Sequence, residues 1–391
     1  MRVLHVIPSI SPVRGGPSQA VLQMVKALRS QGIDAEIATT NDNGDKLLDV
    51  PLYDRIEYQE IPVRFFPRFS PNISAIREFA FSSSFTTWLW QNISNYDLLH
   101  VHAIFSYTST VTMAIARYHQ IPYIVRPLGQ LCSWSLTQSP KKKQIYLKLI
   151  ERANLNHSQA LHFTAELERQ EVSKLDFTPP NFVLPLGLAL PTFIPEARQK
   201  LRQQLNKPVD EPVILFLSRI HEKKGLDYLI PTLGKLRNNF QFTFILAGSG
   251  TADYEMEVER MLEQHKISDR TYKLGFIEGE TKNICLQGAD LYTLTSHSEN
   301  FGIAVLEALA SGTPALVTNG VALSDLVREQ NLGWVVDLEI EAIANAIQEF
   351  LDNLDMAKQR GDRATEYVAE HYNWEKIALN LKAIYAKILA I

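Results

Sequence analysis

The sequence lacks several features that are typical of secreted and membrane-embedded proteins. Its two cysteines, Cys132 and Cys285, lie far apart in 391 residues, which fits a reducing compartment and gives neither a disulfide framework nor zinc-ligand spacing. No apolar run is long enough to span a bilayer. The apolar N-terminus lacks the hydrophobic region of a signal peptide because Pro8 and Ser9 follow at once, so we expect a buried strand there. These absences favour a cytoplasmic protein.

The composition is that of an ordinary globular protein. Hydrophobic residues make up 46% and charged residues 21%, with a net charge of −4. The charge is unevenly spread: residues 1–190 carry 18 Lys and Arg against 15 Asp and Glu, whereas the remainder carries 21 against 28. The length is sufficient for two domains. We expect no nucleic-acid partner.

Short apolar runs alternate with amphipathic stretches along nearly the whole chain, for example RVLHVI, DLLHVH, VILFLS and LYTLTS. Strands that alternate with helices predict parallel sheets covered on both faces. We therefore predict an α/β fold of two Rossmann-like, doubly wound domains that face each other across a cleft. The expected parts are a first Rossmann-like domain over 1–190, a linker over 191–211, a second Rossmann-like domain over 212–372 and a C-terminal helix over 373–391. That helix is expected to pack on the first domain.

Two glutamates stand out in the segment SHSENFGIAVLEALASGTPALVT, residues 296–318. Glu299 lies in the loop after a predicted strand, and Glu307 lies in the helix that begins after Gly302. In open parallel sheets, ligands bind beyond the carboxyl ends of the strands, and a helix N-terminus is a ready site for phosphate oxygens. Glu307 has mainly apolar neighbours in sequence, so it should need hydrogen-bonding partners such as the two hydroxyls of a ribose. The alternative is a structural ion pair with Arg or Lys.

A second signal is SRIHEKKG, which follows the predicted strand VILFLS. It places Arg219 and Lys224 before a helix that opens near Gly225. Two fixed cations at a strand end suit a diphosphate, because they stabilise the charge that grows as a nucleotide leaves. The alternative is a solvated surface loop.

The combination of SRIHEKKG with two glutamates eight positions apart around an FG pair resembles the family 4 glycosyltransferases, and the resemblance covers nearly the whole chain. It implies the GT-B fold, a retaining mechanism and a nucleotide-sugar donor. The resemblance implies further that residues 1–190 form the acceptor-side domain and residues 212–372 the nucleotide-sugar-binding domain. It also implies a role for each matching position. Glu307 would hold the ribose, Glu299 the hydroxyls of the transferred sugar, and Arg219 and Lys224 the diphosphate. The segment Asn300, Phe301, Gly302, Ile303, Ala304 and Val305 would contact sugar and phosphate, and Phe276 and Ile277 would frame the base.

The N-terminal half carries matching features. Gly15 and Gly16 follow the first predicted strand, where a glycine pair permits close approach to the donor phosphate; a plain tight turn is the alternative. His100 and His102 lie on one face of a predicted strand. The resemblance places the active-site histidine at His102, and we interpret His100 as a packed core residue. LPLGLAL has Leu186 where many members have asparagine, which leaves the acceptor open.

The resemblance leads to a specific reaction. We predict transfer of a hexose, with glucose and UDP favoured over other sugars and GDP, to a saccharide or lipid-linked acceptor. The overall pattern resembles bacterial enzymes of exopolysaccharide or envelope-polysaccharide synthesis, including cyanobacterial ones. No D-x-D pair is present in the sequence, so we predict no metal and no cofactor, with Arg219 and Lys224 as catalytic cations beside His102 and Glu299. By analogy we favour front-face displacement over a carboxylate nucleophile.

Other interpretations remain open at this point. A sugar-nucleotide epimerase or a phosphorylase could use the same architecture. AGSGTAD, residues 247–253, resembles the start of a dinucleotide motif but lacks the third glycine, so an NAD-dependent oxidoreductase is a weaker alternative.

The basic segment SPKKKQIYLKLIERA, residues 139–153, raises the question of membrane contact. Lys141, Lys142 and Lys143 precede an apolar stripe of Ile145, Leu149 and Ala153. This pattern predicts peripheral contact with an anionic membrane, here at its inner face, or a non-catalytic membrane adaptor. The alternative is a core helix with a solvated basic start.

Overall fold

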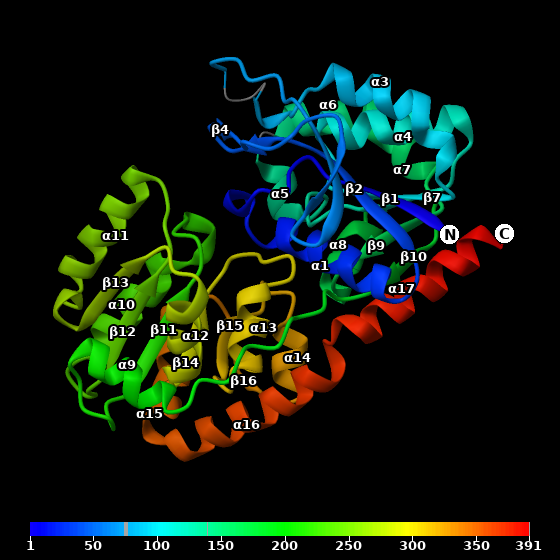
Figure 1. Ribbon diagram of the computed structural model, residues 1–391. Helices are drawn as coiled ribbons and strands as arrows, with labels where there is room; N and C mark the ends of the chain where they lie inside the picture. Colours follow the sequence, from blue (N-terminus) through cyan, green and yellow to red (C-terminus); the bar gives the residue numbers. More distant parts are fainter. Residues whose placement is uncertain (74–76, 139, 391) are drawn as a thin grey trace. The chain divides into compact units, whose positions relative to one another are not determined.

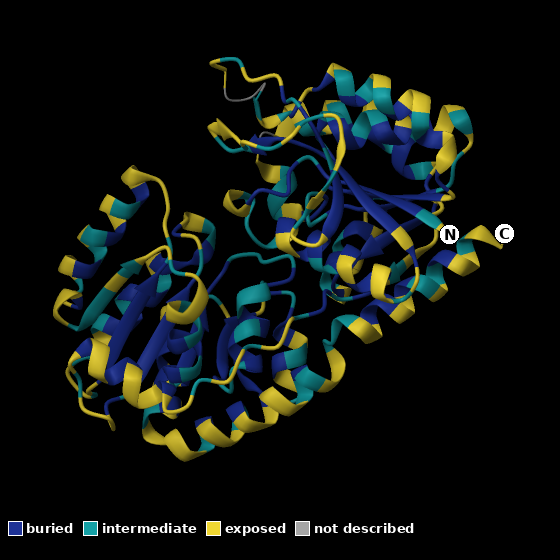
Figure 2. Cartoon of the chain, in the orientation of Figure 1, coloured by how far each residue is buried: buried dark blue, intermediate teal, exposed yellow. Residues whose placement is uncertain are grey.

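The computed structural model describes residues 1–73, 77–138 and 140–390. In it the chain forms two compact units, residues 1–187 with 374–391, and residues 188–373. Each unit is built on one main β-sheet covered by helices, and the central strands of each sheet are deeply buried (Figures 1 and 2). The predicted fold class of two Rossmann-like α/β units is confirmed.

The first unit has an eight-stranded sheet in the order β10-β9-β8-β7-β1-β2-β6-β5. All neighbouring pairs in this sheet are parallel except β5–β6 at one end, which is antiparallel. The main strands are β1 (Arg2–Val6), β2 (Asp34–Thr40), β5 (Arg55–Tyr58), β6 (Ile61–Phe66), β7 (Leu98–His102), β8 (Tyr123–Arg126), β9 (Ala160–Phe163) and β10 (Asn181–Val183). A short hairpin of β3 (Asp42–Asn43) and β4 (Lys46–Leu47) stands apart from it.

Helices connect these strands, and their apolar faces form the core. The buried cluster of this unit joins side chains of β1, β7, β8 and β9 to α3 and α4. The helices are η1 (Pro12–Arg14), α1 (Gly16–Ser30), α3 (Ser83–Asn92), η2 (Ile93–Asn95), α4 (Tyr107–His119), α5 (Ser133–Thr137), α6 (Pro140–Tyr146), η3 (Leu147–Glu151), α7 (Arg152–Asn156), α8 (Glu166–Ser173) and α17 (Trp374–Leu389). The C-terminal helix α17 lies beside α1 (Figure 1), where the Lys382 ammonium donates to the carbonyl of Gln31 at 2.7 Å.

The second unit has a six-stranded, fully parallel sheet in the order β13-β12-β11-β14-β15-β16. Its strands are β11 (Val213–Leu217), β12 (Thr243–Ala247), β13 (Thr271–Gly275), β14 (Leu291–Leu294), β15 (Ala315–Thr318) and β16 (Gly333–Val336). Its helices are α9 (Ala197–Leu205), η4 (Glu222–Lys224), α10 (Leu226–Leu236), α11 (Ala252–Gln264), η5 (Ser268–Arg270), α12 (Gly279–Gly288), α13 (Ile303–Ala310), α14 (Ser324–Glu329), α15 (Ile340–Asp352) and α16 (Leu354–His371).

The predicted linker over 191–211 is wrong in its central part. Residues 197–205 form α9, which belongs to the second unit. Leu201 and Leu205 are buried, and the guanidinium of the fully buried Arg202 pairs with Asp290. The charge-rich sequence concealed this because two partners of Arg202, Gly288 and Asp290, lie 86 and 88 positions away, which local composition does not reveal.

Both sheets have a point where the strand order reverses. In the second unit β11 lies between β12 and β14, and in the first unit β1 lies between β2 and β7. At such a switch point the two connecting loops leave in opposite directions, so a crevice forms beyond the carboxyl ends of the strands. The loops after β11 and β14, and after β1 and β7, are therefore the first places to look for ligand contacts.

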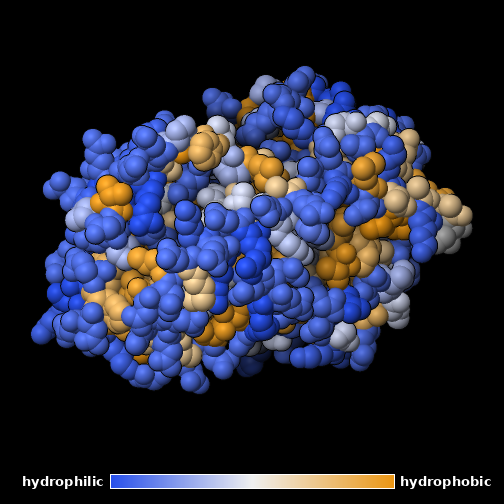
Figure 3. Space-filling model, turned by 90° about the horizontal axis from the view of Figure 1, so that it is seen from below, coloured by the Kyte–Doolittle hydropathy of each residue, from blue (hydrophilic) through white to orange (hydrophobic). Residues whose placement is uncertain are grey.

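The surface is mixed in character. On the face seen in Figure 3, apolar side chains occur in separate groups among hydrophilic ones. Within the described residues, no helix is sufficiently long and apolar to cross a membrane.

Candidate active site

The switch point of the second unit is held together by contacts between the loops after β11 and β14. The Thr295 hydroxyl donates to the carbonyl of Gly225 at 2.9 Å, and the amide of His297 donates to the carbonyl of Lys223 at 2.9 Å. Gly225 has φ +66°, and a Cβ there would lie 1.9 Å from the Thr295 carbonyl oxygen. Only glycine fits this close approach, which fixes Lys224 beside the end of β14.

Lys224 and Glu299 form an ion pair across this switch point. Lys224 is 7% exposed, and Glu299 is half-buried. Burial raises the pKa of Glu299, but the Lys224 ammonium, with Lys223 and Arg219, outweighs it and holds the pKa below its usual value. The two residues that the sequence assigned to diphosphate and sugar therefore lie together, with Glu299 as a carboxylate.

Arg219 lies in the same loop as Lys224 and is exposed. Among the described residues its guanidinium has no hydrogen bond or salt bridge, so it can reach a ligand. Its neighbour Ile220 donates its amide to the carbonyl of Ser249 at 2.9 Å, and a Cβ on Gly250 would lie 2.1 Å from the Ile220 carbonyl oxygen. Close packing of the two loops that follow β11 and β12 thus explains the glycine at position 250 of AGSGTAD.

The helix α13 begins after Gly302, which has φ +85°, a left-handed conformation that favours glycine. The first helical amides have no partner within a helix, so those of Ile303 and Ala304 point out at its N-terminus. The Val305 amide donates to the Gly302 carbonyl at 2.9 Å, so it is less available to a ligand than the two amides before it. Phe301 is 5% exposed and packs near Tyr372, so it can offer a ligand only its backbone, while Asn300 is half-buried.

Glu307 has a cationic partner. The Lys282 ammonium of α12 donates to Glu307 Oε1 at 2.7 Å, and the two side chains are 28% and 23% exposed. The carboxylate is thus partly accessible to solvent, although its neighbours in the sequence are mainly apolar. The alternative of an ion pair with lysine is realised in this structure, and Lys282 is a residue that sequence reasoning missed. No local pattern could reveal it, because it lies 25 positions before Glu307 on another helix.

The two residues that were predicted to frame the base follow β13. Phe276 is 69% exposed, and Ile277 is half-buried in the loop before α12. A large aromatic ring in solvent at a strand end is a surface on which a flat base could stack.

The remaining candidates belong to the first unit. Gly15 has φ +76°, and a Cβ there would meet nothing within 4 Å, so the backbone conformation rather than crowding favours glycine. Gly16 is the first residue of α1. The pair therefore opens α1, whose N-terminus has no side-chain capping hydrogen bond.

His102 ends β7 and is fully buried. Its Nε2 lies 2.9 Å from Nδ1 of His5 on β1, so this contact spans the switch point. Burial, followed by His100 and Arg126, lowers the pKa of His102 well below its usual value, so the imidazole is neutral at pH 7. His100, which we interpreted as a core residue, is fully buried and lies 2.6 Å from the Tyr385 hydroxyl.

His5, His100 and His102 are geometrically able to share a metal ion, since one nitrogen of each lies within 4.8 Å of the others. Their surroundings oppose it. The positive charge of Arg126 acts on all three, and a buried cation repels a metal ion strongly. The cluster is better described as a hydrogen-bonded network.

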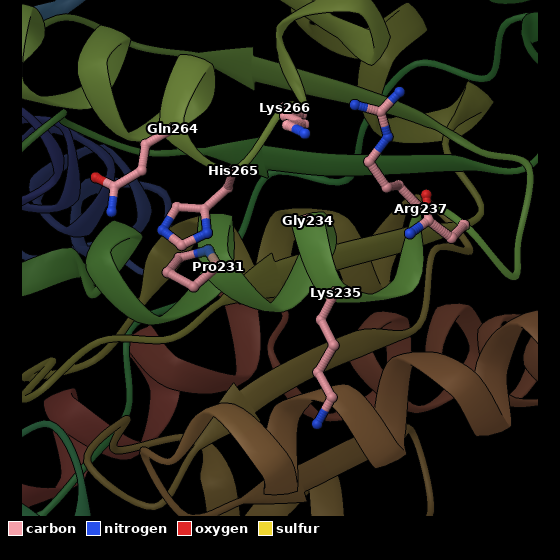
Figure 4. A pocket seen from close by; sticks show the side chains of 8 residues that line it. Pro231, Gly234, Lys235, Arg237, Gln264, His265 and Lys266 are labelled. Atoms are coloured by element: carbon pink, nitrogen blue, oxygen red, sulfur yellow. The ribbon is translucent and has the colours of Figure 1, made fainter.

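A hollow of about 520 Å³ is lined by the end of α10 and the segment after α11, including Pro231, Lys235, His265 and Lys266 (Figure 4). α10 starts beyond the carboxyl end of β11 and runs back along the sheet, so this hollow lies at the opposite end of the strands from Arg219. Lys235 is already paired with Glu341. The hollow is therefore separate from the candidate site.

Comparison with known proteins agrees with this geometry. The family model "Glycosyl transferase 4-like domain" matches residues 15–187, and "Glycosyl transferases group 1" matches residues 197–367. The chain belongs to the family 4 glycosyltransferases. This family assignment agrees with the sequence prediction and gives no support to the alternative of an NAD-dependent oxidoreductase.

Among curated relatives, an uncharacterized glycosyltransferase of Methanocaldococcus jannaschii is 29% identical over 49% of this chain and 48% of its own. The chain spans about half the length of the first such relatives it matches.

Among solved structures, sucrose-phosphate synthase of Thermosynechococcus elongatus has a TM-score of 0.80 at 21% identity, covering all of both chains. Anabaena HepE in complex with UDP and glucose has a TM-score of 0.79 at 20% identity, covering 99% and 100%. These structural likenesses establish the GT-B fold of the glycosyltransferase.

Proposed function

We propose that this glycosyltransferase is a retaining, metal-independent hexosyltransferase. It would move glucose from UDP-glucose to a saccharide or lipid-linked acceptor in bacterial polysaccharide synthesis. The observation that supports this most is the group of Arg219, Lys224 and the α13 N-terminus around one switch point. A crevice with two cations and free amides suits the diphosphate of a nucleotide sugar.

The proposal that no metal ion is needed rests on two side chains that can neutralise the charge of the leaving diphosphate. As the bond from sugar to phosphate breaks, negative charge grows on the leaving diphosphate, and fixed donors there stabilise the transition state. Arg219 is exposed and unpaired among the described residues, and Lys224 contributes its charge from beside Glu299. These side chains would supply what a divalent cation supplies in other enzymes.

The carboxylates would select the sugar and the ribose. Lys224 occupies Oε2 of Glu299, and the other oxygen can accept a hydroxyl of the transferred hexose. Glu307 would accept the ribose hydroxyls, in exchange for or beside Lys282. The ring of Phe276 would stack on uracil. The HepE structure holds UDP and glucose as its ligands, which favours the same pair here.

Retention would follow from front-face displacement, in which the leaving phosphate oxygen accepts the acceptor proton. The ion pair with Lys224 stabilises the Glu299 carboxylate and favours a binding role over that of a nucleophile. Neutral His102 has an unpartnered Nδ1 among the described residues and would hydrogen-bond a donor sugar hydroxyl.

The decisive test is a screen of donor hydrolysis and calorimetric binding across UDP- and GDP-linked hexoses. We expect UDP-glucose to bind most tightly and to be hydrolysed with retention of the anomeric configuration, observed by NMR, equally fast with or without EDTA. Preference for a GDP-sugar would overturn the donor assignment, and loss of activity in EDTA would overturn metal independence. An epimerase would yield the epimeric nucleotide sugar without any acceptor.

Peripheral membrane contact is a second part of the proposal. The predicted alternative of a core helix does not fit, because Ile145 and Leu149 on α6 and η3 are 60% and 72% exposed. Lys141, Lys142 and Lys148 are exposed around them. We name these five residues the basic apolar surface, and its chemistry suits anionic lipid at the inner face of the membrane.

Lys143 does not belong to the basic apolar surface. It is half-buried, and its ammonium donates to the Ser135 hydroxyl at 3.3 Å. Burial lowers its pKa. The sequence grouped three consecutive lysines, but the turn of the helix separates them.

A further inference from the structure

One face of the first unit's sheet carries a layer of buried polar side chains. The layer crosses four neighbouring strands in the order β9-β8-β7-β1, and all its members are fully buried. It consists of His5, His100, His102, Arg126, His162 and, from α17, Tyr385. Polar groups in such a position are retained only when they find hydrogen-bonding partners.

The histidines of the layer have partners. His162 Nε2 lies 2.9 Å from the Leu184 carbonyl and Nδ1 lies 3.3 Å from His100 Nε2. His100 in turn contacts Tyr385, and His5 contacts His102. Each of the four imidazoles therefore has at least one hydrogen bond.

Arg126 is different. None of its three guanidinium nitrogens has a hydrogen-bond partner among the described residues. The acid whose charge acts on it is Glu168, but the Glu168 oxygens accept from the amides of Gly129 at 2.7 Å and Thr164 at 3.0 Å, and the two side chains form no salt bridge in the described structure. A buried cation without partners is costly.

Arg202 in the second unit provides a comparison. It is equally buried, but its guanidinium donates to the carbonyl of Glu211 at 3.0 Å, to that of Gly288 and to the carboxylate of Asp290. Arg202 therefore has a structural role, in which its hydrogen bonds stabilise the second unit. Arg126, by contrast, presents five unused N–H donors in a planar fork that matches two oxygens of a carboxylate or phosphate.

The position of Arg126 is that of a ligand contact. It ends β8 and lies opposite His102 in the register of β7 and β8, at the carboxyl end of the sheet. The loops after these strands contain three non-glycine residues with positive φ, Ala103 at 73°, Phe105 at 56° and Leu128 at 58°. Backbone strain of this kind concentrates at binding sites.

We propose that Arg126 binds an oxyanion of the acceptor, a sugar carboxylate or sugar phosphate, and thereby selects acidic acceptors over neutral ones. The inference rests on the proposed transferase function, since it assigns the acceptor of that reaction. Because Arg126 has no exposed surface, the acceptor can reach it only when the loop after β8 moves, and Leu128 and Gly129 are the residues of that loop with positive φ.

The test is thermal unfolding of the full chain with UDP saturating throughout, so that the donor diphosphate site is filled. The probes are glucose 6-phosphate, glucuronate and inorganic phosphate, with glucose and sodium chloride at matched ionic strength as references. We expect the acidic probes to raise the Tm of the wild-type chain and the references not to. Arg126→Met should weaken the apparent affinity for them at least about tenfold without lowering the Tm in their absence.

Arg202→Met is the matched control, and it should lower the Tm while the response to acidic probes persists. If Arg126→Met does not fold, Arg126→Lys replaces it and should bind more weakly than wild type, because it keeps the charge but loses the fork. A response to glucuronate alone assigns a carboxylate, and one to the phosphates alone assigns a phosphate. The proposal is overturned if no acidic probe stabilises the wild type or if Arg126→Met responds equally. Failure of UDP itself to bind would instead refute the proposed UDP donor, and failure of both UDP and GDP to bind would refute the transferase proposal.

Discussion

Lys224, after β11, and Glu299, after β14, form an ion pair across the point where the strand order of the second sheet reverses. The pair joins a candidate diphosphate ligand to a candidate sugar ligand. The Lys224 ammonium holds the pKa of the Glu299 carboxyl below its usual value in a partly buried place, so a ligand meets groups that are already oriented.

Removal of the cations should affect turnover more than binding. Arg219→Ala and Lys224→Ala should each lower kcat for donor hydrolysis by at least about tenfold, with a smaller change in the Kd of the sugar nucleotide, because phosphate charge is greatest in the transition state. Lys235→Ala, which removes an exposed cation paired with Glu341, is the control. Wild-type turnover in both variants would show that the diphosphate assignment is incorrect.

Glu307 should contribute directly to nucleotide affinity. Glu307→Ala should weaken UDP binding in calorimetry by about 1–3 kcal/mol, since it leaves ribose hydroxyls without an acceptor. Lys282→Met removes the partner instead and should change UDP affinity much less. If both variants lose stability while UDP affinity is unchanged, Glu307 has only the structural role of an ion pair with Lys282.

The lowered pKa of Glu299 predicts a pH dependence of stability. Because the folded-state pKa lies below the usual value of 4.5, the carboxylate contributes stability that is fully present above that value. The contribution is lost as the pH falls through the folded-state pKa. The difference in unfolding free energy between wild type and Glu299→Gln, measured in urea, should thus be constant near neutral pH and shrink below about pH 4.5. A difference independent of pH would contradict this.

The basic apolar surface should mediate weak, salt-sensitive binding to lipid. We expect the protein to sediment partly with anionic liposomes at low salt, because each exposed lysine gains about 1 kcal/mol near such a surface. Replacement of Lys141, Lys142 and Lys148 by glutamine should abolish sedimentation and leave UDP affinity unchanged. Lys143→Gln is the control and should sediment like wild type, since Lys143 is held by Ser135. Sedimentation that survives the triple replacement would refute the role of this surface.

The sequence by itself determined the architecture. Runs such as RVLHVI and VILFLS lie between amphipathic stretches, and β1 and β11 formed there, because buried parallel strands need continuous apolar residues and their crossovers need helices. It also located Arg219, Lys224, Glu299 and Glu307, since residues that follow strands meet at the carboxyl end of a parallel sheet.

The tertiary structure decided which partner each charge has. Lys282 pairs with Glu307 from another helix. The buried Arg202 of α9 pairs with Asp290 of the second unit, where the sequence had predicted a linker. Arg126 is buried without the partners that Arg202 has. The tertiary structure also decided that Lys148 rather than Lys143 is exposed beside Leu149. Local patterns record the period of a helix or strand, whereas the pairing of buried charges depends on which elements the topology brings together. That information is distributed over positions far apart in the chain.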